Sequence, residues 1–103
     1  MQSNQVRLQL PFEVKDRMKR GERFTILDVR EPDEWASGHI RGAKHIPLGE
    51  LESRHKEIDK KEEIVVVCRS GGRSSVACEL LAAIGYNAIN MPGGMMAWQG
   101  DME

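Results

Sequence analysis

The stretch that decides the fold is Ile64-Val65-Val66-Val67-Cys68-Arg69-Ser70-Gly71-Gly72-Arg73-Ser74. Its first four residues are β-branched, which is typical of a strand covered on both faces of a parallel sheet. Residues 73–84 have the apolar periodicity of a helix. The predicted apolar stripe of this helix consists of Val76, Leu80 and Ile84, flanked by Ala77 and Leu81. The order therefore predicts a buried strand, a sharp glycine turn and a helix.

The glycine turn predicts a site for negative charge. Gly71 and Gly72 permit the unusual backbone dihedrals that a sharp turn needs. The N–H groups of the turn and of the first helical turn then converge on one small volume, which favours an anion. Cys68 is expected at the rim of this volume, where the helix N-terminus and two arginines favour its thiolate. Of these arginines, Arg73 is expected to face the cradle, whereas Arg69 is more readily solvated.

The second cysteine, Cys78, is expected to be an inert core residue, because it lies among apolar neighbours and burial raises the pKa of a thiol. A bridge between Cys68 and Cys78 would have to span roughly 10 Å or more along the helix, so no disulfide is predicted. Two reduced thiols indicate a cytoplasmic protein.

Two further motifs accompany the cysteine loop. The first runs through Leu27–Trp35, Gly38–Ala43 and Ile46–Pro47. The second, Pro92–Trp98, has the pattern Gly-Gly-x-x-x-Trp. With these three motifs in this order, the chain resembles the rhodanese family of sulfurtransferases in its small single-domain form. The resemblance extends from about Leu8 to Trp98.

The resemblance implies that Cys68 is the sulfur-carrying nucleophile. It also implies a substrate-binding loop made of Arg69, Ser70, Gly71, Gly72, Arg73 and Ser74. The implied reaction moves a sulfane sulfur from thiosulfate or a persulfide to a thiophilic acceptor, through a persulfide on Cys68. The implied partners are a small-molecule sulfur donor and a thiol or cyanide acceptor, or a sulfur-accepting protein. No cofactor is expected, and the three histidines lack the spacing and the cysteine companions of a zinc site.

Two other functions remain open at this stage. Tyrosine phosphatases and arsenate reductases of related architecture use a loop with five residues between cysteine and arginine. Here four residues separate Cys68 from Arg73, which favours sulfur over phosphate or arsenate. A persulfide carrier or binding module that serves one partner protein is the second alternative.

The rest of the chain alternates strands and helices. Helical segments are expected at 10–20, 34–37, 48–58, 73–84 and 93–99, and strands at 24–29, 43–46, 64–67 and 87–91. This alternation predicts an α/β fold, in which a central parallel sheet of about five strands carries helices on both faces. We expect a single domain over 1–103, with its core at about 8–99. The active site should lie beyond the carboxyl ends of the strands.

The composition and net charge of the chain bear on which classes of partner it can bind. Hydrophobic residues make up 40% and charged residues 30% of the 103 residues, as in an ordinary globular domain. A net charge of −1 argues against nucleic acid or a membrane surface as the main partner. The polar start Met1–Gln5 predicts no export signal. Asp28 and Arg30 end a strand on the catalytic side, and the resemblance implies that they organise the surroundings of the site.

Overall fold

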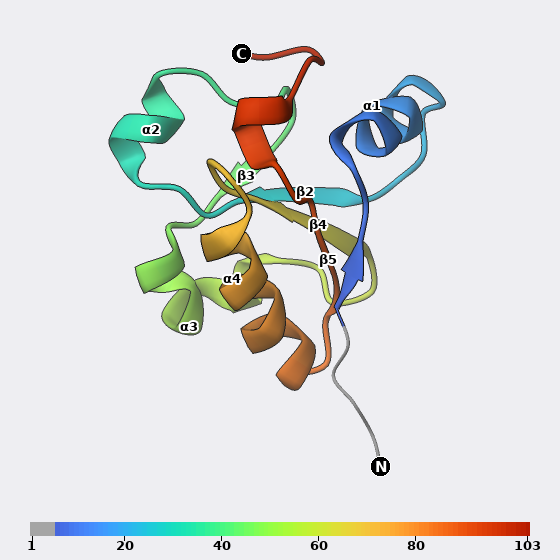
Figure 1. Cartoon of the computed structure of the whole chain (residues 1–103). Helices are drawn as coiled ribbons and strands as arrows, with labels where there is room; N and C mark the ends of the chain where they lie inside the picture. Colours follow the sequence, from blue (N-terminus) through green and yellow to red (C-terminus); the bar gives the residue numbers. More distant parts are fainter. Residues whose placement is uncertain (1–5) are drawn as a thin grey trace.

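The fold is a parallel sheet flanked by helices (Figure 1). The structure, a computed structural model, describes residues 6–103. Its five strands lie in the order β1-β5-β4-β2-β3, and every neighbouring pair is parallel. The strands are β1 (Arg7–Leu8), β2 (Thr25–Asp28), β3 (Lys44–His45), β4 (Glu63–Val67) and β5 (Asn87–Asn90). This arrangement confirms the predicted α/β fold.

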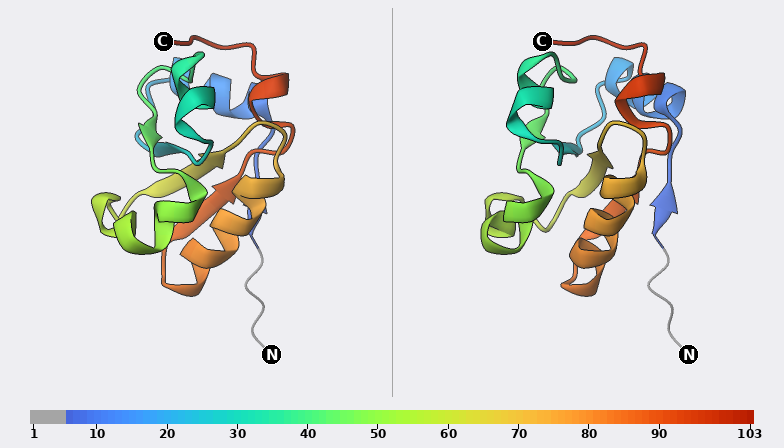
Figure 2. Two further views of the ribbon diagram at one scale, coloured as in Figure 1. Left: turned by 90° about the vertical axis from the view of Figure 1, so that its left-hand side faces the viewer. Right: turned by 60° about the vertical axis from the view of Figure 1, so that its left-hand side comes forward.

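Helices cover both faces of the sheet (Figures 1 and 2). The helical segments are α1 (Pro11–Lys19), α2 (Pro32–Ala36), η1 (Leu48–Glu50), α3 (Leu51–Arg54), η2 (His55–Glu57), α4 (Gly72–Ala83) and η3 (Gly94–Ala97). Two buried clusters result, one on each face. The first joins the sheet to α3 and α4, and the second joins it to α1 and to the chain around Trp98.

Strand β4 contributes side chains to both buried clusters. Ile64 and Val66 belong to the cluster on the α4 face, whereas Val65 and Val67 belong to the cluster on the α1 face. Successive side chains of a strand point to opposite faces. The alternation therefore directs the next side chain, that of Cys68, toward α4.

The prediction for the central apolar stripe of α4 was wrong, although its flanking residues Ala77 and Leu81 are buried. The expected stripe is the exposed one, because Val76, Leu80 and Ile84 keep 50%, 45% and 43% of their surface accessible. The residues that face the sheet are instead Ser74, Ala77, Cys78 and Leu81. Two apolar rows run along this helix, and the row with the smaller residues allows the helix axis to approach the sheet more closely.

The segment 48–58 is not the continuous helix that its pattern predicted. It consists of the short segments η1, α3 and η2. The hydroxyl of Tyr86 donates a hydrogen bond of 2.8 Å to the main-chain oxygen of His55. The same oxygen accepts from the N–H group of Ile58 at 2.9 Å, so it is satisfied without the regular α-helical pattern.

Both ends of the chain also differ from the prediction. Strand β1 was missed, because its two residues are exposed and form no apolar run. The expected helix over 93–99 is only the 3₁₀ turn η3. The polar segment Met1–Gln5, used above to argue against an export signal, lies outside the described residues. Among the residues described, no helix has the length and apolar character that crossing a bilayer requires.

Candidate active site

The cysteine loop connects β4 to α4 through a left-handed turn. Gly71 has φ +112° and immediately precedes the first residue of α4. A Cβ atom at this position would lie 3.3 Å from the main-chain nitrogen of Gly93. Glycine is therefore required by the turn and by the close approach of the segment that follows β5.

That second segment supports the loop from behind. The N–H group of Met95 donates to the carbonyl oxygen of Cys68 at 2.8 Å, and that of Met96 donates to the carbonyl oxygen of Arg69 at 3.0 Å. Gly94 makes this contact possible, because a Cβ atom there would overlap both carbonyl groups. The Gly-Gly-x-x-x-Trp motif thus holds the cysteine loop in place.

The sulfur of Cys68 points into the turn and is surrounded by hydrogen-bond donors. Its Sγ accepts from the N–H groups of Gly71 at 3.1 Å and Ser74 at 3.3 Å. The hydroxyl oxygen of Ser74 also lies 3.3 Å from Sγ. The whole residue is only 1% exposed, so Cys68 lies deeper than the rim position that the sequence predicted.

These donors determine the pKa of Cys68. Burial alone would raise it, but hydrogen bonds from the Ser74 hydroxyl and from the amides of Ser74, Gly71 and Ser70 outweigh burial and place the pKa below its usual value. Cys78 shows the opposite behaviour, because burial without such donors raises its pKa to about 12. The two thiols of the chain are therefore chemically distinct.

Arg73 differs from its expected role. Its Nη1 and Nη2 atoms donate to the two carboxylate oxygens of Glu34 at 2.7 and 2.8 Å, so its guanidinium is held by α2. Through these bonds Arg73 lowers the pKa of Glu34 to about 2. The charge of Arg73 still acts on Cys68 through space, since Cys68 is one of the groups that raise the pKa of Arg73.

A pocket of about 310 Å³ opens beside the loop. Its lining residues are Arg30, Glu34, Ser37, Arg69, Met95 and Met96. Arg69 is exposed and has no ion-pair partner within residues 6–103. Arg30 is buried and bound to Asp28, with Nη2 2.8 Å from a carboxylate oxygen. The pocket thus combines one free and one paired guanidinium.

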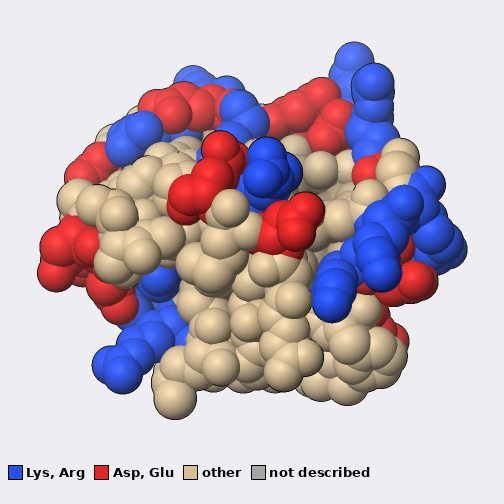
Figure 3. Space-filling view, turned by 90° about the horizontal axis from the view of Figure 1, so that it is seen from above, with Lys and Arg blue, Asp and Glu red and all other residues tan. Residues whose placement is uncertain are grey.

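The charges around this end of the sheet are mixed. Seen from above, acidic and basic side chains are mixed across the upper part of the view, basic side chains gather on the side of α1, and the lower middle carries no charged side chains (Figure 3). Such a surface has no single-sign field that would steer a large polyanion. The pocket beside the loop itself combines the guanidinium groups of Arg30 and Arg69 with the carboxylate of Glu34.

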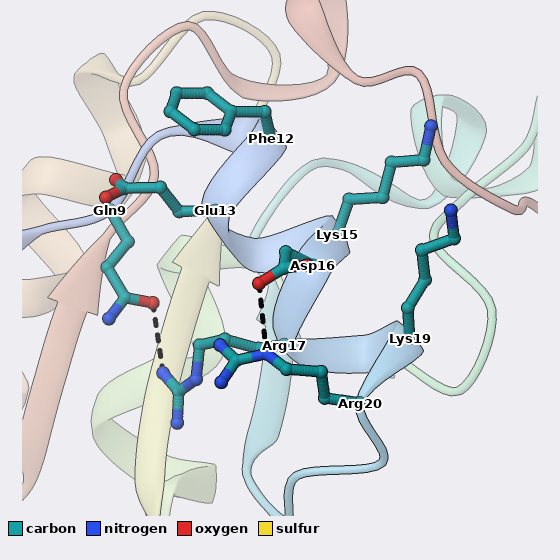
Figure 4. A pocket seen from close by; sticks show the side chains of 8 residues that line it. All are labelled: Gln9, Phe12, Glu13, Lys15, Asp16, Arg17, Lys19 and Arg20. Carbon is teal, nitrogen blue, oxygen red and sulfur yellow. Dashed lines mark hydrogen bonds and ion pairs between the residues drawn. The ribbon is translucent and has the colours of Figure 1, made fainter.

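A larger hollow of about 560 Å³ lies along α1. Figure 4 shows that its side chains come from this helix, from Arg20 directly after it and from Gln9. Arg20 pairs with Asp16 at 3.0 Å, and Arg17 donates to Gln9 at 3.0 Å. The lining contains no cysteine, serine or threonine that could act as a nucleophile. This hollow therefore offers no side chain for nucleophilic catalysis.

The two tryptophans have different environments. Trp98 is buried at 8% exposure, as expected of a core anchor. Trp35 is only half-buried, and its ring stacks on that of His39 with centroids 3.4 Å apart. Nδ1 of His39 lies 3.0 Å from the carbonyl oxygen of Trp35, consistent with a local role for this histidine. Within residues 6–103, no group of three or more His, Cys, Asp or Glu side chains is placed to hold a metal ion.

Sequence reasoning missed two residues of this site, Glu34 and Asn90. Glu34 holds Arg73, as described above. Asn90 ends β5 and is 6% exposed, and its Oδ1 lies 2.6 Å from the hydroxyl oxygen of Ser74. A signal for Asn90 was available, since it is a polar residue between the apolar residues Ile89 and Met91.

Comparison with known proteins identifies the family. The model of the rhodanese-like domain matches residues 10–101. The chain is 40% identical over 90 residues to the putative sulfurtransferase YtwF of Bacillus subtilis and covers 87% of both proteins. It is 41% identical to the putative sulfur carrier protein YrkF of the same organism, but spans only 49% of that protein. The chain belongs to the rhodanese family.

A solved structure supports the same assignment. The crystal structure of a rhodanese-like domain protein from Staphylococcus aureus superposes with a TM-score of 0.90 at 33% sequence identity, covering 95% of this chain and 97% of that one. The family match and the names of the relatives support sulfur transfer as the general activity of this chain.

Proposed function

We propose that the protein is a sulfurtransferase that takes a sulfane sulfur from thiosulfate or a persulfide and carries it as a persulfide on Cys68. One observation carries the proposal, namely that Sγ of Cys68 accepts two main-chain N–H bonds inside the turn. A thiolate is the nucleophilic form of cysteine, and these donors favour it without a general base.

In the first step, the thiolate of Cys68 attacks the outer sulfur of thiosulfate. A new S–S bond forms, the S–S bond of the donor breaks, and sulfite leaves with the bonding electron pair. In the second step, a thiol or cyanide attacks the terminal sulfur of the persulfide, and Cys68 departs as a thiolate. Two displacements therefore return the enzyme to its starting state without a cofactor.

We assign donor binding to Arg69, Ser70, Gly71, Gly72, Arg73 and Ser74. The exposed guanidinium of Arg69 lines the pocket beside the loop and is suited to hold the sulfonate end of thiosulfate. The N–H groups of the turn are suited to stabilise the thiolate and the persulfide anion. Arg73 acts through its charge and through its bond to Glu34. Arg30, which is held by the buried Asp28, lines the same pocket.

The free state of both thiols supports a cytoplasmic location. Cys78 is completely buried in the α4 cluster and has no part in the proposed reaction. The sulfur acceptor would be a cellular thiol or a thiol on another protein, because either can attack the terminal sulfur of a persulfide.

The test is the formation of thiocyanate from thiosulfate and cyanide, together with the intact mass of the protein after thiosulfate alone. We expect one added sulfur on wild-type protein and on Cys78→Ala, and none on Cys68→Ser. Transfer by Cys68→Ser, or sulfur found on Cys78, would overturn the assignment.

A persulfide carrier for a partner protein is the second candidate. The observation in its favour is the relative named as a putative sulfur carrier, of which this chain spans about half. Transfer from the persulfide of Cys68 to glutathione and dithiothreitol favours the enzyme, whereas a persulfide that resists both and moves only to one protein favours the carrier. Hydrolysis of an aryl phosphate without any sulfur transfer would favour the phosphatase alternative.

A further inference from the structure

The hydroxyl group of Ser74 has three candidate partners and only one proton. Its Oγ lies 2.6 Å from Oδ1 of Asn90, 3.1 Å from the carbonyl oxygen of Gly71 and 3.3 Å from Sγ of Cys68. Ser74 is fully buried and Asn90 is 6% exposed, so solvent does not compete for these bonds. The Ser74 hydroxyl proton can point either to Asn90 or to the sulfur of Cys68, so the hydrogen bonding of one group affects that of the other.

The short contact with Asn90 matches a neutral Cys68. When Ser74 donates to Oδ1 of Asn90, the oxygen lone pairs of Ser74 face the sulfur, and a thiol S–H group can donate to them. Once the thiol proton has left to solvent, the same arrangement would place oxygen lone pairs against a negatively charged sulfur. The Ser74 hydroxyl must then turn its proton toward Sγ.

That turn would leave two oxygens 2.6 Å apart without a proton between them, unless Asn90 also changes. In the observed orientation, Oδ1 of Asn90 accepts from the Ser74 hydroxyl at 2.6 Å, and Nδ2 lies 3.4 Å from the carbonyl oxygen of Gly71. This contact is near the upper limit for a hydrogen bond, so losing it costs little, although rotation also turns Oδ1 toward the carbonyl oxygen of Gly71. A rotated amide would place Nδ2 as a donor to Ser74, and Ser74 would donate to the sulfur.

We propose that Asn90 is a positioning residue for Cys68, which it controls through Ser74. Its amide accepts the Ser74 proton while the sulfur is a thiol and rotates to donate to Ser74 when the sulfur is a thiolate or persulfide anion. No bond to carbon or sulfur changes in this step, and each group keeps its own protons apart from the one that Cys68 releases. The proposal rests on the proposed function only in taking Cys68 as the reactive sulfur.

Several other titratable groups lie close to the sulfur of Cys68. The ones close to the loop, on all the elements that surround it, are Asp28, Arg30, Glu34, Arg69, Arg73 and the thiol of Cys78. None of them makes a hydrogen bond to the Ser74 hydroxyl in the described part of the chain. A change at Asn90 should thus reach Cys68 by way of Ser74.

The first test is the pH dependence of alkylation of Cys68 by iodoacetamide, with Asn87→Leu as the matched control. Asn87 begins the same strand but is exposed and binds Arg7. We expect Asn90→Leu to slow alkylation at pH 6 by about 3- to 10-fold, because the thiolate loses the equivalent of about one hydrogen bond. Asn87→Leu should leave the alkylation rate unchanged. An unchanged rate in Asn90→Leu would overturn the proposal. A faster rate would overturn it too, because Asn90 would then only compete with the sulfur for the Ser74 proton.

A double-variant cycle tests the route. In a Ser74→Ala background, Asn90→Leu should have no further effect on the alkylation rate, since the connecting hydroxyl is gone. Ser75→Ala, one residue away on α4, is the control background and should keep the full effect. The same slowing in Ser74→Ala as in wild type would overturn the route through Ser74.

The wild-type protein offers a test that does not depend on whether Asn90→Leu folds. The side-chain amide of Asn90, followed by ¹⁵N NMR, should shift with the midpoint of the Cys68 titration and should stop responding in Cys68→Ser. An amide signal that stays constant through this titration would overturn the rotation. None of these measurements requires sulfur transfer, so failure of the proposed function leaves their outcome interpretable.

Discussion

Arg73 and Glu34 form a two-pronged ion pair that joins the start of α4 to α2, with N–O distances of 2.7 and 2.8 Å. Each carboxylate oxygen accepts from a different guanidinium nitrogen, which is the geometry that makes arginine pairs specific. The pair connects the turn that contains Cys68 to the segment between β2 and β3. It gives Arg73 a role in holding the site together beyond its charge.

Breaking this pair should destabilise the protein modestly. The two side chains are 35% and 26% exposed, so solvent screening limits the contribution, and we expect Glu34→Gln to lower the free energy of unfolding by about 1 kcal/mol. Urea titration measures the change. The control is Asp33→Asn, which makes the same kind of substitution on the exposed side of α2. An equal loss in both variants would contradict a specific role for the pair.

The contribution of Glu34 to the free energy of unfolding should decrease as the pH falls. The pKa of Glu34 is about 2 in the folded protein, against 4.5 ordinarily. A carboxyl group with a depressed pKa stabilises the folded state fully above the higher value, and this stabilisation disappears as the pH falls toward the lower one. The difference in unfolding free energy between wild type and Glu34→Gln should thus shrink between pH 4.5 and 2. A difference that stays constant over this range would contradict the pairing.

The two cysteines should react at different pH. Because hydrogen bonds lower the pKa of Cys68 and burial raises that of Cys78 to about 12, iodoacetamide should modify only Cys68 in the native protein near neutral pH. In urea both thiols should react at similar rates. Peptide mapping identifies the modified residue, and native modification of Cys78 at a comparable rate would be inconsistent with its burial.

Gly94 should tolerate no side chain. Its φ of +55° and the overlap of a Cβ atom with the carbonyl groups of Cys68 and Arg69 both oppose alanine. We expect Gly94→Ala to destabilise the protein by about 1–3 kcal/mol and to slow sulfur transfer, because the loop must move away. Gly49→Ala is the control, since a Cβ atom there meets nothing within 4 Å. Wild-type stability and turnover in Gly94→Ala would show that η3 does not support the loop.

Arg69 and Arg73 should affect different measurements. Arg69→Ala should raise the KM for thiosulfate about 10-fold or more, as expected for one charge-assisted bond, with little change in stability. Arg73→Ala should lower stability as Glu34→Gln does. Arg23→Ala, an exposed arginine after α1, is the control for loss of one positive charge. A KM for Arg69→Ala equal to that of Arg23→Ala would remove Arg69 from donor binding.

Some of the site could be predicted from local chemistry. The β-branched run before Cys68, the glycines after it and the helix that follows are neighbours in sequence, so their geometry depends on short-range backbone preferences. The burial of Cys78 was predictable for the same reason. The exposed stripe of α4 was not, because both rows of that helix are apolar and only contact with the sheet selects one.

The sequence by itself determined the parallel α/β fold, the turn that aims main-chain donors at Cys68 and the contrast between the two thiols. The turn and the contrast between the thiols follow from residues that are adjacent in the chain, and the fold follows from the alternation of strands and helices along it. Tertiary structure alone decided that Glu34 holds Arg73 and that Asn90 contacts Ser74, pairs that are 39 and 16 residues apart. Partners at such separations meet only when the sheet order and the helix positions are fixed, and no local pattern encodes those distances.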